Sequence, residues 1–178
     1  ICRDFLDGKT PVEALLFEIR KVQFHHSIHN VDDQISSIFI AHPDSIKLAR
    51  AFPTIFLMDC TYKTNKFKMP LLHIAGINNY SRSLSVGFCF ISAEKKENYA
   101  WALQEFATIL ENKQPQVIVT DKEQALINAI EEVFPKTKHL LCRWHIFKNI
   151  QLNCQKHFKS EEAWLHFTKH WNILCASS

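Results

Sequence analysis

The stretch TIFLMD, residues 54–59, is an apolar run that ends in a carboxylate, Asp59. Four consecutive apolar residues without alternation are typical of a β-strand that is buried on both faces. Two further strands are predicted at 70–78 and 83–92, and the short polar segment NNYSR joins them. Because short connections join antiparallel neighbours, we expect these three strands to form an antiparallel meander.

The second half of the chain alternates between helical and strand patterns. A helix at 97–110 precedes an apolar strand at 114–121, and a helix at 122–134 precedes a short strand at 139–142. The helical segment RWHIFKNIQLNCQKHF follows. Strands that are reached through a helix join a sheet in parallel. The pattern therefore predicts an α/β fold, a mixed sheet of three antiparallel and two parallel strands flanked by helices.

The N-terminal region carries weaker signals. The segment at 10–30 begins with a helical pattern that Thr10 can cap, and SSIFIA reads as a short strand before Pro43. A short helix follows, with Asp44 as its expected N-cap. We expect residues 1–50 to form a lead-in segment and residues 51–150 to form the core.

The composition is that of an ordinary globular protein, with 47% hydrophobic residues, 22% charged residues and a net charge of +3. This mild basicity is compatible with a nucleic-acid partner but does not require one. No apolar run is long enough to span a membrane, and the first residues do not resemble a secretory signal. The six cysteines are scattered, which favours free thiols in a reducing compartment, the cytosol or the nucleus.

Two aspartates form the first candidate site. Asp59 and Asp121 each close an apolar strand, and their strands become neighbours if the fourth strand joins beside the first. Ligand sites in open α/β sheets lie outside the carboxyl ends of the strands. Two carboxylates that converge there repel each other unless a cation neutralises them, and Mg²⁺ commonly takes one or two carboxylates plus phosphate oxygens. The alternative for Asp121 is structural, because Gln124 stands three residues later and the two could form a capping box.

Cysteine and histidine pairs suggest a second kind of site. Cys142 and His145 have C-x2-H spacing, as do Cys154 and His157, so the two pairs together could supply four zinc ligands. The segment between them reads as helix, however, and twelve helical residues span about 18 Å. A shared tetrahedral site therefore needs a break in that helix, and we expect none.

Lysines follow the first aspartate closely. The residues are Lys63, Lys66 and Lys68. They could contact DNA phosphates, and an ordinary solvated loop explains them equally well.

Three segments in this order resemble the transposase core of Mutator-like elements (MULE). They are FPTIFLMDCTYKTNKFKMPLLHIAGIN, VIVTDKEQALINAIEEVFP and HLLCRWHIFKNI. The resemblance implies a ribonuclease-H-like fold and a DDE-type nuclease and strand-transfer activity on DNA with Mg²⁺ or Mn²⁺. Asp59 and Asp121 match the first two catalytic aspartates of the family, and Cys142 with His145 matches its C-x2-H motif. The third acid, a glutamate, follows a helical insertion in the family, and we expect residues 151–178 to be the start of that insertion.

Two functions follow from these observations. The first is a transposase catalytic core, expected as an incomplete fragment or a decayed copy, because Glu161 and Glu162 are the only acids after the C-x2-H motif and lie early in a helical stretch. The alternative is a transposase-derived DNA-binding or regulatory protein without catalysis. Under both hypotheses we expect a nuclear location and DNA as partner, and a homo-oligomer stays open. A metal-free α/β interaction domain is a third hypothesis, and it predicts no salt-dependent DNA binding.

Overall fold

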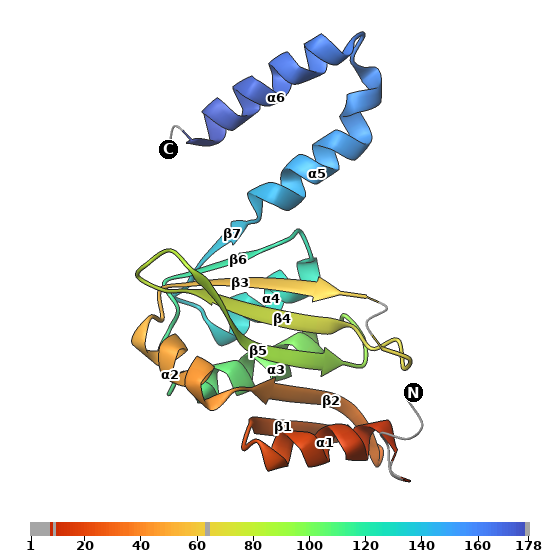
Figure 1. The fold of residues 1–178 in the computed structure, drawn as a ribbon, viewed down its shortest axis with the longest axis vertical. Coiled ribbons are helices and arrows are strands. Elements are labelled where there is room, and N and C mark those ends of the chain that lie inside the picture. The colour runs from red at the N-terminus through yellow and green to blue at the C-terminus, as the bar shows by residue number, and fades with distance from the viewer. Residues whose placement is uncertain (1–7, 9, 63–64, 177–178) are drawn as a thin grey trace. The chain divides into compact units, whose positions relative to one another are not determined.

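A seven-stranded mixed sheet organises the first and larger of two compact units, Ile1–Leu140 and Leu141–Ser178. The computed structural model describes residue 8 and residues 10–62 and 65–176. The strands are ordered β1-β2-β5-β4-β3-β6-β7 (Figure 1). Their bounds are β1 His25–Val31, β2 Gln34–Ala41, β3 Ile55–Thr61, β4 Leu71–Ile77, β5 Ser83–Ile91, β6 Val117–Thr120 and β7 Lys138–Leu141.

The predicted meander is confirmed. β3 pairs antiparallel with β4, and β4 pairs antiparallel with β5. β6 joins β3 on its other side in parallel, as expected for a strand reached through a helix. β7 lies next to β6 at the edge, and the Lys138 amide donates to the Gln116 carbonyl at 2.9 Å.

The prediction of a five-stranded sheet is wrong, because an N-terminal hairpin extends the sheet beyond β5. β2 pairs antiparallel with β5, and β1 pairs antiparallel with β2. β1 has the sequence HHSIHNV, whose polar residues give no strand signal. Its strand character comes from pairing through a two-residue turn, Asp32–Asp33, in which both residues have positive φ, 50° and 58°. Such turns match the twist of the strands that they connect.

Helices cover the two faces of the sheet unequally. The helices of this unit are α1 Pro11–Lys21, α2 Pro43–Ala51, α3 Lys96–Ile109 and α4 Gln124–Val133. The main core lies on the face of α2, α3 and α4, where the fully buried Phe106 ring contacts Phe56 at 4.9 Å and Phe134 at 5.9 Å between centroids. A smaller cluster packs Ile19 of α1 against Ile38 and Ile40 on the opposite face. Figure 1 shows α1 over β1 and β2, with α3 and α4 on the far side of the sheet.

The helix ends test the predicted caps. Thr10 caps α1, as expected, and it forms a capping box with Glu13. Asp44 does not cap α2, because the N-cap is His42, whose Nδ1 accepts the Asp44 amide at 3.1 Å. Asp44 lies instead in the first turn, where its negative charge interacts favourably with the positive end of the helix dipole.

The second unit is a pair of helices joined by a short 3₁₀ turn. They are α5 Arg143–Cys154 and α6 Glu161–Ala176, with η1 Gln155–His157 between them. Aromatic side chains hold the pair together: Phe147 stacks on the buried Trp164 at 6.1 Å between centroids, and Trp164 stacks on Phe167 at 5.5 Å. Among the residues that the structure describes, no helix is both long and apolar enough to cross a membrane. All five described cysteines are free thiols, as predicted.

Candidate active site

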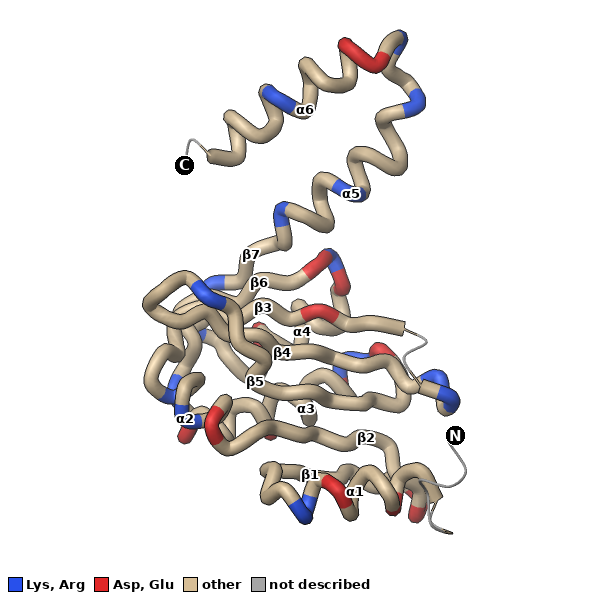
Figure 2. Tube along the Cα trace, viewed as in Figure 1, with Lys and Arg blue, Asp and Glu red and all other residues tan. Residues whose placement is uncertain are grey.

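The two aspartates lie near the C-terminal ends of two neighbouring strands, β3 and β6. Met58 of β3 pairs with Thr120 of β6 in parallel register, so the next residues are Asp59, within β3, and Asp121, directly after β6. Adjacent strands lie about 4.8 Å apart. Both aspartates are half-buried. Figure 2 shows these acidic positions in β3 and directly after β6.

Asp59 is not the last residue of its strand, which corrects one expectation. β3 continues through Cys60 to Thr61, because these two residues still pair with Leu72 and Leu71 of β4. Met58 and Cys60 both turn toward the main core. Asp59 therefore points to the opposite face, the face on which α1 covers β1 and β2.

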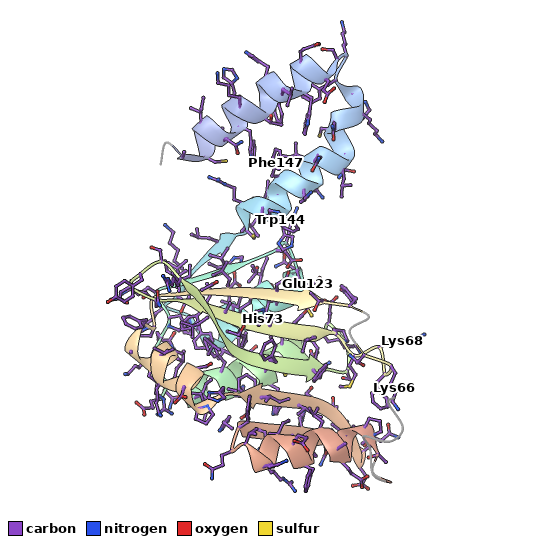
Figure 3. All side chains as sticks on the ribbon, viewed as in Figure 1. Lys66, Lys68, His73, Glu123, Trp144 and Phe147 are labelled. Carbon is purple, nitrogen blue, oxygen red and sulfur yellow. The ribbon has the colours of Figure 1, made fainter. Side chains whose placement is uncertain are left out.

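Asp121 is not the cap of the helix that follows it. α4 begins at Gln124 and its N-cap is Glu123, whose carboxylate accepts the Ala125 amide at 3.1 Å (Figure 3). The Gln124 side chain donates to Asn128 at 2.8 Å and takes no part in a capping box. The hypothesis that Asp121 caps α4 in a capping box with Gln124 is thus wrong.

A buried hydroxyl fixes the backbone at Asp121. Thr120 is 1% exposed, and its Oγ1 donates to the Asp121 carbonyl at 2.6 Å. The same oxygen lies 2.9 Å from Nε2 of His139 on β7. Because the hydroxyl has one proton and uses it on the carbonyl, His139 must be the donor in the second bond. Burial lowers the pKa of His139, while the charge of Glu131 opposes that shift.

The Glu94 carboxylate anchors the C-terminal end of β3, the strand that carries Asp59. Glu94, after β5, accepts hydrogen bonds from the hydroxyls of Tyr62 and Tyr99, the latter at 3.0 Å. Tyr99 also hydrogen-bonds Cys60, and burial raises the pKa of the Cys60 thiol to about 12. Burial also raises the pKa of Tyr99. These neutral, bonded groups fix the residues that directly follow Asp59.

His73 of β4 is the direct cross-strand partner of Asp59. Its Nε2 lies 2.9 Å from the Ser85 hydroxyl of β5, and its ring stacks on Phe88 with centroids 4.7 Å apart and planes 6° apart. Burial lowers the pKa of His73, and the nearby Asp59 carboxylate opposes this shift. His73 was not predicted as a site residue, although a histidine inside the apolar run LLHIAG is a signal that could have indicated it.

The lysine loop follows β3. Lys63 lies outside the described residues. Asn65 shapes the described part, because its side-chain Oδ1 accepts the backbone amides of Phe67 and Met69 at 3.0 and 3.2 Å. Lys66 and Lys68 are exposed and line, together with Tyr62 and Asn65, a depression of about 580 Å³. Figure 3 shows both lysines projecting from the loop, away from the strands.

The C-x2-H residues belong to the second unit. Cys142 is the N-cap residue of α5, and His145 lies in its first turn, where the ring packs edge-on against Trp144 at 4.8 Å. The expected helix between the two cysteine–histidine pairs is confirmed, since α5 runs to Cys154 before the 3₁₀ turn. Across the described residues, no group of three or more histidines, cysteines or acids is arranged to hold a metal ion.

Known proteins resemble this chain in sequence. Residues 55–149 match the model of the MULE transposase domain. Protein FAR1-RELATED SEQUENCE 5 of Arabidopsis thaliana is 29% identical over 146 residues, which cover 79% of this chain and 18% of that protein. FAR1-RELATED SEQUENCE 11 of the same plant is 32% identical over 66% of this chain and 17% of its own length. FAR-RED IMPAIRED RESPONSE 1, also of this plant, is 27% identical over 68% of this chain and 15% of its own length.

This chain thus spans less than a fifth of each of these three relatives. The family match runs from the first residue of β3 into α5, so it contains the five strands β3 to β7 and both aspartates. It covers more than half of the 178 residues, and the chain belongs to the MULE transposase domain family.

Proposed function

We propose that this chain is the catalytic core of a MULE transposase, in which Asp59 and Asp121 hold Mg²⁺ or Mn²⁺ and cut DNA at transposon ends. One observation carries the proposal: the two aspartates follow a paired position on adjacent parallel strands, and neither caps a helix. Like charges at this spacing need a cation or a proton between them. The family's function requires two carboxylates at this place.

The donors fit a hard divalent ion. Mg²⁺ is commonly held by one or two carboxylates and completes its octahedral shell with water and substrate phosphate oxygens. Because no group of three or more histidines, cysteines or acids in the described residues is arranged to hold a metal, the site would hold such an ion together with a phosphate. The ion would supply an activated water and neutralise charge on the phosphate. Asp59 and Asp121 would orient it, through the fixed end of β3 and the Thr120 hydrogen bonds.

The proposed reaction is hydrolysis of a phosphodiester. The oxygen of water bonds to phosphorus, the bond from phosphorus to the 3′ oxygen breaks, and that oxygen takes up a proton. The products are a 3′-hydroxyl and a 5′-phosphate. In the transfer step the 3′-hydroxyl attacks a phosphodiester of the target DNA, and one new bond replaces the one broken.

The sheet supports a ribonuclease-H-like core. Five of its strands, in the order β5-β4-β3-β6-β7, combine an antiparallel meander with two strands reached through helices. We propose that these five form the core and that the β1–β2 hairpin is an addition to its edge. Residues 151–178 would then begin the helical insertion of the family.

The DNA path is proposed along the lysine loop. Lys66 and Lys68 follow the strand of Asp59 and are exposed beside a depression, so they could pair with phosphates on either side of the cut. Figure 2 shows these basic positions beyond the end of β3. A nuclear location and assembly into a homo-oligomer on transposon ends belong to the same proposal.

Calorimetric titration with Mn²⁺ tests the metal site. The double variant Asp59→Asn with Asp121→Asn keeps the shape of both side chains and removes both charges, so binding should disappear. Asp32→Asn with Asp33→Asn, in the β1–β2 turn, removes the same charge elsewhere and should bind as the wild type does. Undiminished binding by the Asp59/Asp121 variant would end the proposal.

A transposase-derived DNA-binding regulator without catalysis is the second candidate. Two observations favour it: no group of three or more histidines, cysteines or acids in the described residues is arranged to hold a metal, and one relative is named Protein FAR-RED IMPAIRED RESPONSE 1. A regulator of this kind would bind DNA equally well with and without Mg²⁺ and would release no 3′-hydroxyl ends. Incubation of labelled duplex DNA with Mn²⁺ separates the two candidates.

A further inference from the structure

The region beside Asp59 contains a second, more specific arrangement. His73 is held on β4 by two residues of β5, the Ser85 hydroxyl at 2.9 Å and the Phe88 ring at 4.7 Å between centroids. Residues three apart on a regular strand point to opposite faces of the sheet. Ser85 and Phe88 nevertheless both reach one imidazole.

A β-bulge explains this contact. The register of β4 and β5 shifts between Ile74, which pairs with Gly87, and Ala75, which pairs with Ser85. Val86 is the extra residue, and its side chain is buried in the main core. The bulge thus turns Ser85 back to the face of Phe88. Bulges are frequent beside active sites, where they redirect a side chain.

The hydrogen bond between His73 and Ser85 leaves one donor unused in either tautomer of the imidazole. When Ser85 donates to Nε2, the imidazole carries its proton on Nδ1, which is then a donor. When Nε2 donates to Ser85, the serine hydroxyl keeps its own proton to donate. In either case one donor of the pair remains for a third group, next to Asp59.

We propose that His73 and Ser85 are positioning residues that donate a hydrogen bond to a phosphate of the DNA strand beside the aspartate pair. This inference rests on the proposed function, because it takes DNA as the substrate. A phosphate near Asp59 and Asp121 meets two negative charges, so a donor in the adjacent position of the same face favours its binding. Ser85 is exposed, and Phe88 is 37% exposed, so the group of His73, Ser85 and Phe88 is accessible to solvent within this unit.

Two substitutions at His73 separate hydrogen bonding from packing. His73→Phe keeps a ring to stack on Phe88 and removes both nitrogens. His73→Asn removes the ring and keeps an amide donor close to the position of Nδ1. The probe is a fluorescein-labelled twelve-nucleotide thymidine strand in Mg²⁺, and the measurement is fluorescence anisotropy with the full chain.

We expect His73→Phe to bind the probe about 10-fold more weakly, because a hydrogen bond to a charged group is lost. His73→Asn should stay within about 3-fold of the wild type, and Ser85→Ala should weaken binding by about 3-fold or more. Replacement of His26, a half-buried histidine on the distant strand β1, is the matched control and should change nothing.

The opposite order, with His73→Phe like the wild type and His73→Asn weak, would show that the ring acts by packing and would overturn the inference. Unchanged binding in all three variants would overturn it as well. Mn²⁺ titration of the same variants keeps the two proposals apart. If Asp59 and Asp121 still bind Mn²⁺ while the His73 and Ser85 variants bind DNA normally, only this inference fails.

Discussion

Thr120→Val tests whether the buried hydroxyl holds the edge that carries Asp121. Valine has nearly the shape of threonine but cannot hydrogen-bond, so the change removes the bonds to the Asp121 carbonyl and from His139. A neutral hydrogen bond contributes about 1 kcal/mol net, and an unpaired buried polar group costs about 1 to 3 kcal/mol. We expect the free energy of unfolding to fall by about 2 kcal/mol. With a urea m-value of about 2 kcal/mol/M, the midpoint should fall by about 1 M.

The assay is urea unfolding of the sheet-containing unit, followed by the indole NMR signal of Trp101 on α3. Thr120→Ser is the control, because it keeps both hydrogen bonds and loses one methyl group, worth about 0.8 kcal/mol. The His139 Nε2–H signal should be protected from exchange in the wild type and in the serine variant, and not in the valine variant. A valine variant within about 0.3 M of the wild-type midpoint, or one that retains the protected His139 proton, would refute the reasoning.

Two further predictions concern the bulge and the lysine loop. Gly87→Ala should lower the free energy of unfolding by about 1 to 2 kcal/mol in the same urea assay. The reason is that the alanine Cβ would lie 3.0 Å from Cζ of the fully buried Phe39. A variant as stable as the wild type would mean that the Phe39 ring moves away at no cost. Lys66→Ala with Lys68→Ala should reduce the slope of log affinity for duplex DNA against log salt by about 1.8, since each phosphate contact contributes about 0.9. Lys21→Ala on α1 is the control, and an unchanged slope in the double variant would place the DNA elsewhere.

Much of the sheet could be predicted because its central strands can be recognised from short, local sequence patterns. The apolar runs that became β3 and β6 can be recognised without knowing their partners. The expected burial on both faces is wrong, because only alternate residues of these strands are buried. Short connections and helical connections then fix antiparallel and parallel neighbours. β1 could not be predicted, because its polar sequence becomes a strand only through pairing with β2.

The candidate site divides in the same way. The two aspartates could be named from the sequence, since each closes an apolar run and both match a family motif. That Asp121 is not a helix cap depended on where α4 begins, and competing caps within three residues of each other are not resolved by spacing. The predicted ion and DNA contacts stay predictions.

The sequence by itself determined the order of strands and helices from β2 onward, the pair of aspartates and the family, because these depend on residues close together in the chain. Only the tertiary structure decided which side chains surround Asp59. His73, Ser85 and Phe88 come together through one bulge, and Thr120 meets His139, nineteen positions later in the chain. The physical reason is that a register shift of one residue moves a side chain to the other face of a sheet, and no local pattern records that shift.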